Sequence, residues 1–242
     1  MKPIPLIALL VVCLGCAVAA QGIYPIYYDC TATGSMENAT RLYVSNGNQT
    51  GVRYTIRLYT SQGGELAMGE YFLNAHASHQ IWLPDLLLGS RASAWGLCLL
   101  QTGFGYPTAL DVVAARYMNG SLLTYERIPD GVVTGWHAFF YDASHSPGGP
   151  ETDTHVTVMN PTDTANHYRI ELYDIYGNGL GTVPGVVNPK CTAVHRLSEW
   201  GGDRNVAFGL CVVRSEQYSY ETFAVNVFRL RAGRILTTET VP

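Results

Sequence analysis

The chain has 242 residues, of which 14% are charged and 47% are hydrophobic, and its formal net charge is −4 at pH 7. A weakly acidic chain with few basic residues argues against nucleic acid as a partner, because phosphate binding needs clustered lysine and arginine. This length suffices for two domains of about a hundred residues, each with its own hydrophobic core.

Residues 1–20 have the pattern of a secretory signal peptide. Lys2 precedes an apolar run that ends in the small residues VAA, a typical cleavage signature. The run is too short to cross a bilayer, and no later segment is apolar enough, so we expect no transmembrane span. The mature chain is predicted to begin near Gln21 and to be secreted, either extracellular or periplasmic. Lipoprotein processing at Cys16 is the alternative, and it would leave the protein anchored by lipid.

A long pattern occurs twice in the chain. Residues 40–129 match residues 154–242 at an offset of 114, which becomes 113 after one extra residue in the first copy. A constant offset over this length is the signature of an internal repeat. The matched pairs include Asn46 with Asn160, Cys98 with Cys211, Arg116 with Arg229, and Pro129 with Pro242. We therefore predict two tandem domains related by internal duplication, residues 21–129 and residues 130–242.

The elements predicted in chain order are short strands. Residues 21–30 form an edge strand, because Pro25 cannot donate a hydrogen bond to a ladder, and residues 136–141 are its counterpart in the second half. Residues 54–59 and 168–173 alternate polar and apolar side chains, which is typical of half-buried antiparallel strands. Each half therefore begins with an edge strand and continues with an amphipathic one.

Turn residues separate the remaining strands. Gly-Gly at residues 63–64 and Asn-Gly at residues 119–120 predict hairpins. The other strands are predicted at residues 78–83, 95–100 and 109–117 in the first half and at residues 192–197 and 208–213 in the second. Only short helical turns are expected, near residues 84–89 and 198–201. Many short strands with turns between them predict an all-β fold of two tandem antiparallel β-sandwiches.

Four cysteines follow the leader: Cys30, Cys98, Cys191 and Cys211. An even number in an exported chain favours disulfides, and pairing within each half is the simplest of the three connectivities, Cys30 with Cys98 and Cys191 with Cys211. None of these four cysteines belongs to a CxxC motif, so we expect no zinc site and no other metal. Four buried thiols are the alternative.

The second half carries a series of features in a fixed order. Trp136 opens a strand, a Pro/Gly loop follows, and the next strand ends at Asn160 and Pro161. Then come the strand YRIELY, the corner LSEW, a central apolar strand and a strand that carries Arg229, and the first half repeats most of this series. In these features the chain resembles the sensory rhodopsin transducer family, small β-sandwich proteins of bacteria. The resemblance implies a non-enzymatic sandwich that associates through its faces and edges. Because this chain is predicted to be exported and contains two such units, we do not expect it to function together with a photoreceptor.

The sequence contains no catalytic signature, and we expect neither an enzyme nor a cofactor. His76 and His79 lie three residues apart on a predicted strand, so their side chains point to opposite faces and cannot share a metal ion. Asp85 and Glu199 are equivalent acids beside turns, where a carboxylate caps backbone N–H groups. A polysaccharide-acting enzyme, which is an alternative, would need both acids in one groove.

Two kinds of residue are candidates for binding. Arg116 and Arg229 hold the same place at the ends of apolar strands, where we expect each to pair with the corner acid of its own half. The alternative is that they bind a ligand carboxylate. The second kind is a set of aromatic side chains on matching loops of the two halves: Phe104, Tyr106, Tyr218 and Tyr220. Sandwich binding sites gather on loops, and exposed tyrosine suits sugar stacking or a protein interface. Aromatic cover for a small core is the alternative.

These observations predict an exported, non-enzymatic tandem β-sandwich protein with a binding or structural role at the cell surface or in the periplasm. Its partner would be a protein or a glycan. The first alternative is a subunit of an extracellular assembly. In that case the strand over residues 23–28 would pair with the sheet edge of a neighbour and form a homo-oligomer through sheet edges.

Overall fold

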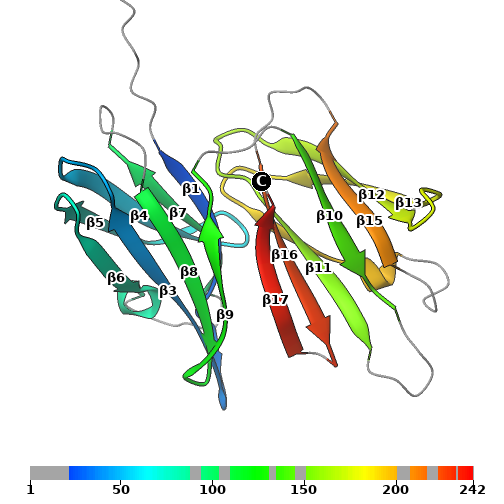
Figure 1. The fold of residues 1–242 in the computed structure, drawn as a ribbon, viewed down its shortest axis with the longest axis horizontal. Coiled ribbons are helices and arrows are strands. Elements are labelled where there is room, and N and C mark those ends of the chain that lie inside the picture. Colours follow the sequence, from blue (N-terminus) through cyan, green and yellow to red (C-terminus); the bar gives the residue numbers. More distant parts are fainter. Residues whose placement is uncertain are drawn as a thin grey trace, which may run out of the picture.

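The computed structural model describes residues 22–87, 94–103, 110–130, 135–144, 151–200, 208–216, 223–232 and 234–241. These residues form seventeen β-strands and two short 3-10 turns, arranged as two β-sandwiches that lie side by side (Figure 1). The strands pair antiparallel, so the predicted all-β antiparallel sandwich fold is confirmed. The predicted leader lies outside the described residues. Within the described ranges, no helix is long and apolar enough to cross a membrane.

The first sandwich contains two facing sheets. Its elements are β1 (Ile23–Asp29), β2 (Ala32–Thr33), β3 (Met36–Asn46), β4 (Val52–Thr60), β5 (Glu65–Leu73), β6 (Ser78–Trp82), the turn η1 (Leu83–Leu86), β7 (Trp95–Thr102), β8 (Leu110–Met118) and β9 (Ser121–Ile128). One sheet has the order β1-β7-β4-β5, and the other has the order β2-β3-β8-β9 with β6 also paired to β3. As predicted from Pro25, β1 is an edge strand, and it pairs with β7 along its whole length.

The second sandwich has the same plan. Its elements are β10 (Trp136–Asp142), β11 (Thr152–Met159), β12 (Asn166–Asp174), β13 (Gly179–Val187), β14 (Thr192–Arg196), the turn η2 (Leu197–Glu199), β15 (Phe208–Ser215), β16 (Ala224–Arg231) and β17 (Arg234–Val241). The sheets have the orders β10-β15-β12-β13 and β14-β11-β16-β17. Apart from β2, this is the strand order of the first sandwich, so residues at repeated positions of the sequence occupy the same place in both. The internal duplication itself stays a prediction.

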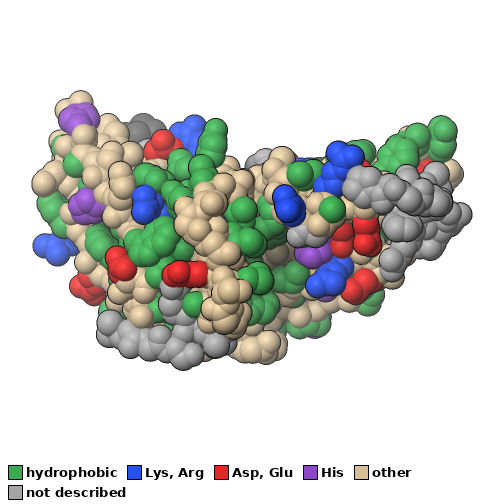
Figure 2. Space-filling model, turned by 90° about the horizontal axis from the view of Figure 1, so that it is seen from below, with side chains coloured by type: hydrophobic (Ala, Val, Ile, Leu, Met, Phe, Trp, Pro, Cys, Tyr) green, Lys and Arg blue, Asp and Glu red, His purple; other side chains and the backbone are tan. Residues whose placement is uncertain are grey.

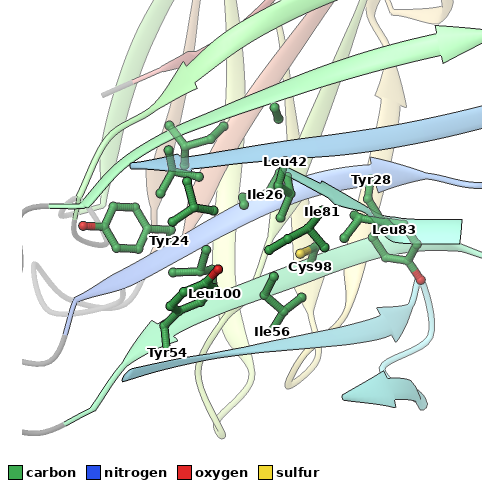
Figure 3. Packing of buried hydrophobic residues seen from close by; sticks show 14 of the residues in the cluster. Tyr24, Ile26, Tyr28, Leu42, Tyr54, Ile56, Ile81, Leu83, Cys98 and Leu100 are labelled. Carbon is green, nitrogen blue, oxygen red and sulfur yellow. The ribbon is translucent and has the colours of Figure 1, made fainter. Parts of the chain in front are cut away.

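The alternation of side chains along the strands builds a core inside each sandwich. In the first sandwich, Tyr24, Ile26 and Tyr28 of β1 point inward and pack with Ile56 of β4 and Leu100 of β7 (Figure 3). A second core of the same kind lies between the sheets of the second sandwich. Full burial of one such side chain stabilises the fold by about 1.5–3 kcal/mol. The two cores therefore supply most of the free energy that holds the sheets together.

Glycine is required at two kinds of position. The hairpin between β8 and β9 has positive φ at Asn119 (49°) and Gly120 (77°), which confirms the turn that Asn-Gly predicts. On the central strand β7, Gly96 has φ +147°, and a Cβ at this position would lie 2.5 Å from the carbonyl oxygen of Tyr59. Gly209 repeats this arrangement on β15, against the carbonyl of Tyr173. Only glycine lets the neighbouring strand come this close.

A buried asparagine holds the same loop in each sandwich. Asn46 and Asn160 each donate from Nδ2 to three backbone carbonyls, at distances of 2.7–3.3 Å. The acceptors are Thr50, Leu73 and Asn74 in the first sandwich and Thr164, Val187 and Asn188 in the second. An unpaired buried carbonyl costs free energy. The single asparagine at each site therefore stabilises the loop by supplying hydrogen-bond donors to the backbone carbonyls where the chain leaves the sheet.

The structure contains no disulfide among its described residues, so the two pairings stay predictions. Cys98 lies in the first core, where burial and then the neighbouring Cys30 raise the pKa of its thiol. Cys211 lies in the second core. Cys191 lies near the first sandwich, since a Cβ at Gly63 would lie 3.0 Å from its Sγ. Cys191 also packs against the second core, so each predicted pair lies within or beside one core.

Candidate functional site

The two sandwiches meet along a hydrophobic junction. Tyr59, Leu97 and Leu99, on the outer face of the first sheet, form one cluster with Met159 and Ala224 of the second sandwich. The strands β9 and β17 contact each other along the same junction (Figure 1). Seen from below, hydrophobic side chains gather across the middle of the molecule, between charged side chains on either side (Figure 2). We call the outer face of β1, β7 and β4 the covered face.

A buried ion pair lies at the edge of the covered face. Arg116 of β8 donates to Glu126 of β9 at 2.5 Å, to the carbonyl of Tyr27 at 2.9 Å and to the hydroxyl of Thr238 in the second sandwich at 3.3 Å. The side chains of Arg116 and Glu126 are only 5% and 3% exposed. The prediction that Arg116 pairs with the corner acid Asp85 is therefore wrong. The physical reason is the pairing of β8 with β9, which brings Glu126 beside the arginine.

The second sandwich completes the surroundings of this pair. Asn226 of β16 donates to the other oxygen of Glu126 at 2.7 Å. The ring of Phe228 packs edge-on against Tyr27, with centroids 5.0 Å apart, and the Arg116 guanidinium lies over both rings at 5.4 and 5.6 Å. A cation–π contact of this kind contributes about 0.5–2 kcal/mol, more when it is desolvated. The charge of Arg116 is thus balanced inside the molecule.

The second sandwich contains the equivalent arginine–glutamate pair, but there the pair is exposed to solvent. Arg229 donates to both carboxylate oxygens of Glu239 at 3.0 Å and to the carbonyl of Phe140 at 3.0 Å. These contacts repeat those that Arg116 makes within the first sandwich, but the two side chains are 24% and 43% exposed. The predicted pairing of Arg229 with the corner acid Glu199 is also wrong, for the same reason: β17 is the neighbour of β16 in the sheet.

Each sandwich carries a row of three large side chains across the outer face of its first sheet, one from each strand. The rows are Tyr27, Leu97 and Tyr59 across β1, β7 and β4, and Phe140, Leu210 and Tyr173 across β10, β15 and β12. Leu97 is fully buried, whereas Phe140 is 52% and Leu210 44% exposed. Trp136, at the start of β10, is 61% exposed. We call this outer face of β10, β15 and β12 the open face.

Charged groups flank the aromatic side chains of the open face. Glu171 of β12 accepts hydrogen bonds from Arg214 at 2.5 Å and from the hydroxyl of Tyr173 at 2.9 Å. Burial raises the pKa of Glu171, but these two hydrogen bonds and the positive charges of Arg214 and Arg169 together outweigh it and hold the pKa below its usual range. A hollow of about 670 Å³ lies among these residues, Trp136 and Phe140. The open face thus combines exposed aromatic area with an ionised glutamate–arginine pair, a composition that suits a protein interface.

A second hollow lies between the sandwiches, at the ends of the β8–β9 and β16–β17 hairpins. Its volume is about 680 Å³, within the range of small-molecule sites. The lining includes Tyr117, Leu123, Arg116, His155 and Arg234. His155 of β11 also contacts Asp153 at 3.0 Å. The lining mixes apolar side chains with groups that donate hydrogen bonds.

The remaining predicted residues lie apart from these surfaces or outside the described ranges. The four loop aromatics proposed as a recognition site lie outside the described residues: Phe104, Tyr106, Tyr218 and Tyr220. Asp85 and Glu199 lie in the turns η1 and η2, one in each sandwich. His76 precedes β6, and His79 within β6 is hydrogen-bonded to the Tyr54 hydroxyl at 3.0 Å. In the part of the chain that the structure describes, no three His, Cys, Asp or Glu side chains are placed to hold a metal ion.

Sequence reasoning placed Trp136 and Phe140 on a strand but did not predict their role on the open face. A signal was present in the strand sequence WHAFFYD. Alternation places Trp136, Ala138 and Phe140 on one face, and Phe139 and Tyr141 on the other. A strand with one solvated face should be polar on that face. Aromatic side chains on both faces of β10 therefore depart from the pattern of a strand with one solvated face.

Comparisons with known proteins assign neither a family nor an activity. No family model and no curated protein matches the sequence. Solved structures that resemble it in part include red sea bream transglutaminase (12% identity, TM-score 0.18), a glycosyl hydrolase family 2 member from Bacteroides cellulosilyticus (10%, 0.19) and a calcium-binding mutant of Bacteroides uniformis beta-glucuronidase 2 (10%, 0.20). Each comparison covers 91% of this chain, which spans only 30%, 28% and 26% of the length of those chains. TM-scores this low carry no argument, and the resemblance to the sensory rhodopsin transducer family stays a prediction.

Proposed function

We propose that the protein is exported and acts as a non-enzymatic binding or structural module, which docks a macromolecular partner on the open face of its second sandwich. The observation that carries this proposal is the exposure of Trp136, Phe140 and Leu210 on one sheet face. Contiguous exposed apolar side chains mark interaction sites, and tryptophan, tyrosine and arginine are frequent among the residues that dominate binding. All three residue types are present on or beside this face.

The covered face supports the proposal from within the same chain. Its row of side chains corresponds in register to the row on the open face, and it forms a stable contact with another sheet. Leu97 and Tyr59 are buried there because a second surface excludes water. A face of this design therefore suits burial as soon as a complementary surface is present.

Export is supported by the signal-peptide pattern of residues 1–20. We expect the intact mass of protein recovered outside the cytoplasm to correspond to a chain that begins near Gln21. Protein that stays in the cytoplasm with residues 1–20 attached would contradict export. A lipid-modified chain beginning at Cys16 would instead support anchoring to the membrane.

A crosslinking experiment in the producing cell tests the docking role. The photoreactive residue p-benzoylphenylalanine replaces Phe140, and in a matched variant it replaces Phe72, which is similarly exposed at 49% but lies on the first sandwich. We expect a crosslinked adduct from position 140 and none from position 72. If position 140 gives no adduct, the open face has no partner and the proposal fails.

A further inference from the structure

We infer that the partner on the open face is a second copy of this chain, joined head to tail. The open face of one copy docks on the outer face of β3, β8 and β9 in the first sandwich of the next copy. This inference rests on the docking role proposed above and names the occupant. It is argued from the contact that already exists between the two sandwiches of one chain.

The occupant of the covered face provides the template. It is the outer face of β11, β16 and β17, which contributes Met159 and Phe228 to the apolar contact and Asn226 and Thr238 to the buried ion pair. One sandwich therefore uses the outer face of its first sheet, and the next sandwich uses the outer face of its second sheet. Two unlike surfaces meet at this junction.

In this arrangement, two outer faces are not used in the junction: that of the first sheet of the second sandwich and that of the second sheet of the first sandwich. Among the described residues, the open face on the second sandwich has no cover. The surface that would match it is the outer face of β3, β8 and β9 on the first sandwich, which has the same strand order as the occupant of the covered face. Tyr125 on that surface is 71% exposed. A second copy thus carries the type of sheet face that covers this row of side chains inside the chain.

The register of the strands predicts which side chains would meet. Tyr125 in β9 holds the position that Thr238 holds in β17. Thr238 contacts Arg116 at the junction, so Tyr125 of the next copy would contact Arg229, the exposed counterpart of Arg116. Ala115 holds the position of Phe228 on this surface, so the ring of Tyr125, directly opposite on the adjacent strand, would supply the cation–π contact that Phe228 supplies to Arg116.

Charges are complementary at the same contact. Arg127 in β9 holds the position of Thr240 in β17, next to the site from which Asn226 donates to Glu126. The counterpart of Glu126 on the second sandwich is Glu239, which is half exposed. Arg127 is exposed as well, pairs with Asp111 of its own sheet at 2.7 Å, and would face this carboxylate in the next copy. Opposite charges at the rim favour this orientation over others.

A contact between two different surfaces repeats along an assembly. Each copy would keep one unused surface at each end, so the assembly closes into a ring or extends as a filament, depending on the rotation between copies. A symmetric dimer would instead use one surface twice. Two variants, one on each surface, separate these cases.

Sedimentation velocity on the full chain, over a series of concentrations, tests the inference. We expect species larger than one chain, and we expect Phe140→Asp and Tyr125→Arg each to weaken association at least about 30-fold, because each places a charge inside the proposed contact. When the two variants are mixed, each supplies the surface that the other lacks. The mixture should form a complex of two chains and nothing larger. Circular dichroism and urea unfolding of each variant establish that it is folded.

A matched control lies away from both surfaces. Met68→Asp changes an exposed apolar residue on β5, an edge strand of the first sandwich, and should leave association unchanged. If this variant abolishes assembly while Phe140→Asp does not, the copies associate through sheet edges and the inference is overturned. A chain that stays single up to about 1 mM also overturns it.

The mass of the crosslinked adduct from position 140 separates failure of this inference from failure of the proposed function. An adduct with the mass of two chains supports self-association. An adduct with a different protein, together with a chain that sediments as a single copy, retains the docking role and overturns the head-to-tail inference. The absence of any adduct overturns both.

Discussion

The covered face and the open face are built alike but lie in opposite environments. On both, a row of large side chains crosses three strands, and an arginine at the edge pairs with a glutamate and donates to a backbone carbonyl of the edge strand. At the covered face the second sandwich removes these groups from water, whereas at the open face they stay exposed. The difference teaches that burial of these residues depends on what packs outside the sheet, since the strand order and the row of side chains correspond.

The largest expected effect separates the two leucines at the centre of the rows. Leu97→Asp should lower the free energy of unfolding by at least about 4 kcal/mol, because it removes a buried side chain and places a charge in the junction. Leu210→Asp, at the matching position, should change the unfolding free energy by less than about 1 kcal/mol. Urea unfolding of both variants measures the difference. Equal losses would show that the open face is as buried as the covered face.

The arginines test the same comparison through charge. Arg116→Ala should cost about 3–5 kcal/mol, because it leaves Glu126 charged and buried without its partner. Arg229→Ala should cost no more than about 1 kcal/mol, because the pair that it breaks is solvated. Thermal or urea unfolding of the two variants provides the measurement. A large loss for Arg229→Ala would mean that its pair is buried in the protein in solution, as an assembled state would require.

Asn46 and Asn160 make equivalent hydrogen bonds in the two sandwiches, so they test a feature that the sandwiches share. Asn46→Ala and Asn160→Ala should each cost about 1–3 kcal/mol, because each leaves buried backbone carbonyls without a donor. The two side chains donate to equivalent carbonyls, so the two losses should be similar. Chemical unfolding with two spectroscopic probes can assign each loss to its sandwich. Clearly unequal losses would argue that the sandwiches differ internally and not only in their surroundings.

The smallest expected effect is a pH dependence that belongs to the second sandwich. Burial lowers the pKa of His195 below its ordinary value, although the nearby Glu199 opposes this shift. Because the folded state disfavours the charged form, the contribution of His195 is present above about pH 6.5 and is lost as the pH falls through the lower folded value. Stability should therefore decrease from pH 7 to pH 5, and His195→Gln should reduce this slope. An unchanged slope in the variant would exclude His195 as its source.

Local signals in the sequence were sufficient for the strands and turns. Alternation over residues 168–173 identifies β12, Pro25 identifies an edge strand, and Asn119 with Gly120 identifies a hairpin. Each of these signals acts within a few residues, through side-chain direction or through allowed backbone angles. For this reason they predict the structure of each half without knowledge of the other half.

The partners of the repeated arginines needed the pairing of strands. The hairpin at Asn119 and Gly120 already places Glu126 within reach of Arg116, but the prediction considers only the corner acid Asp85. Glu239 holds the matching place for Arg229. A carboxylate on the adjacent strand is closer than one at a distant corner, and the strength of a charge pair falls with distance.

The sequence by itself determined the all-β class, the order of strands and turns, and the equivalence of positions in the two halves, because these follow from local periodicity and repetition. The tertiary structure alone decided which of two equivalent faces is buried, and which arginine–glutamate pair is removed from water. The physical reason is that the hydrophobic effect is non-directional and roughly proportional to the apolar area removed from water. A row of apolar side chains therefore does not specify which surface will cover it. The same row of side chains is therefore stable in a junction on one sandwich and available for a partner on the other.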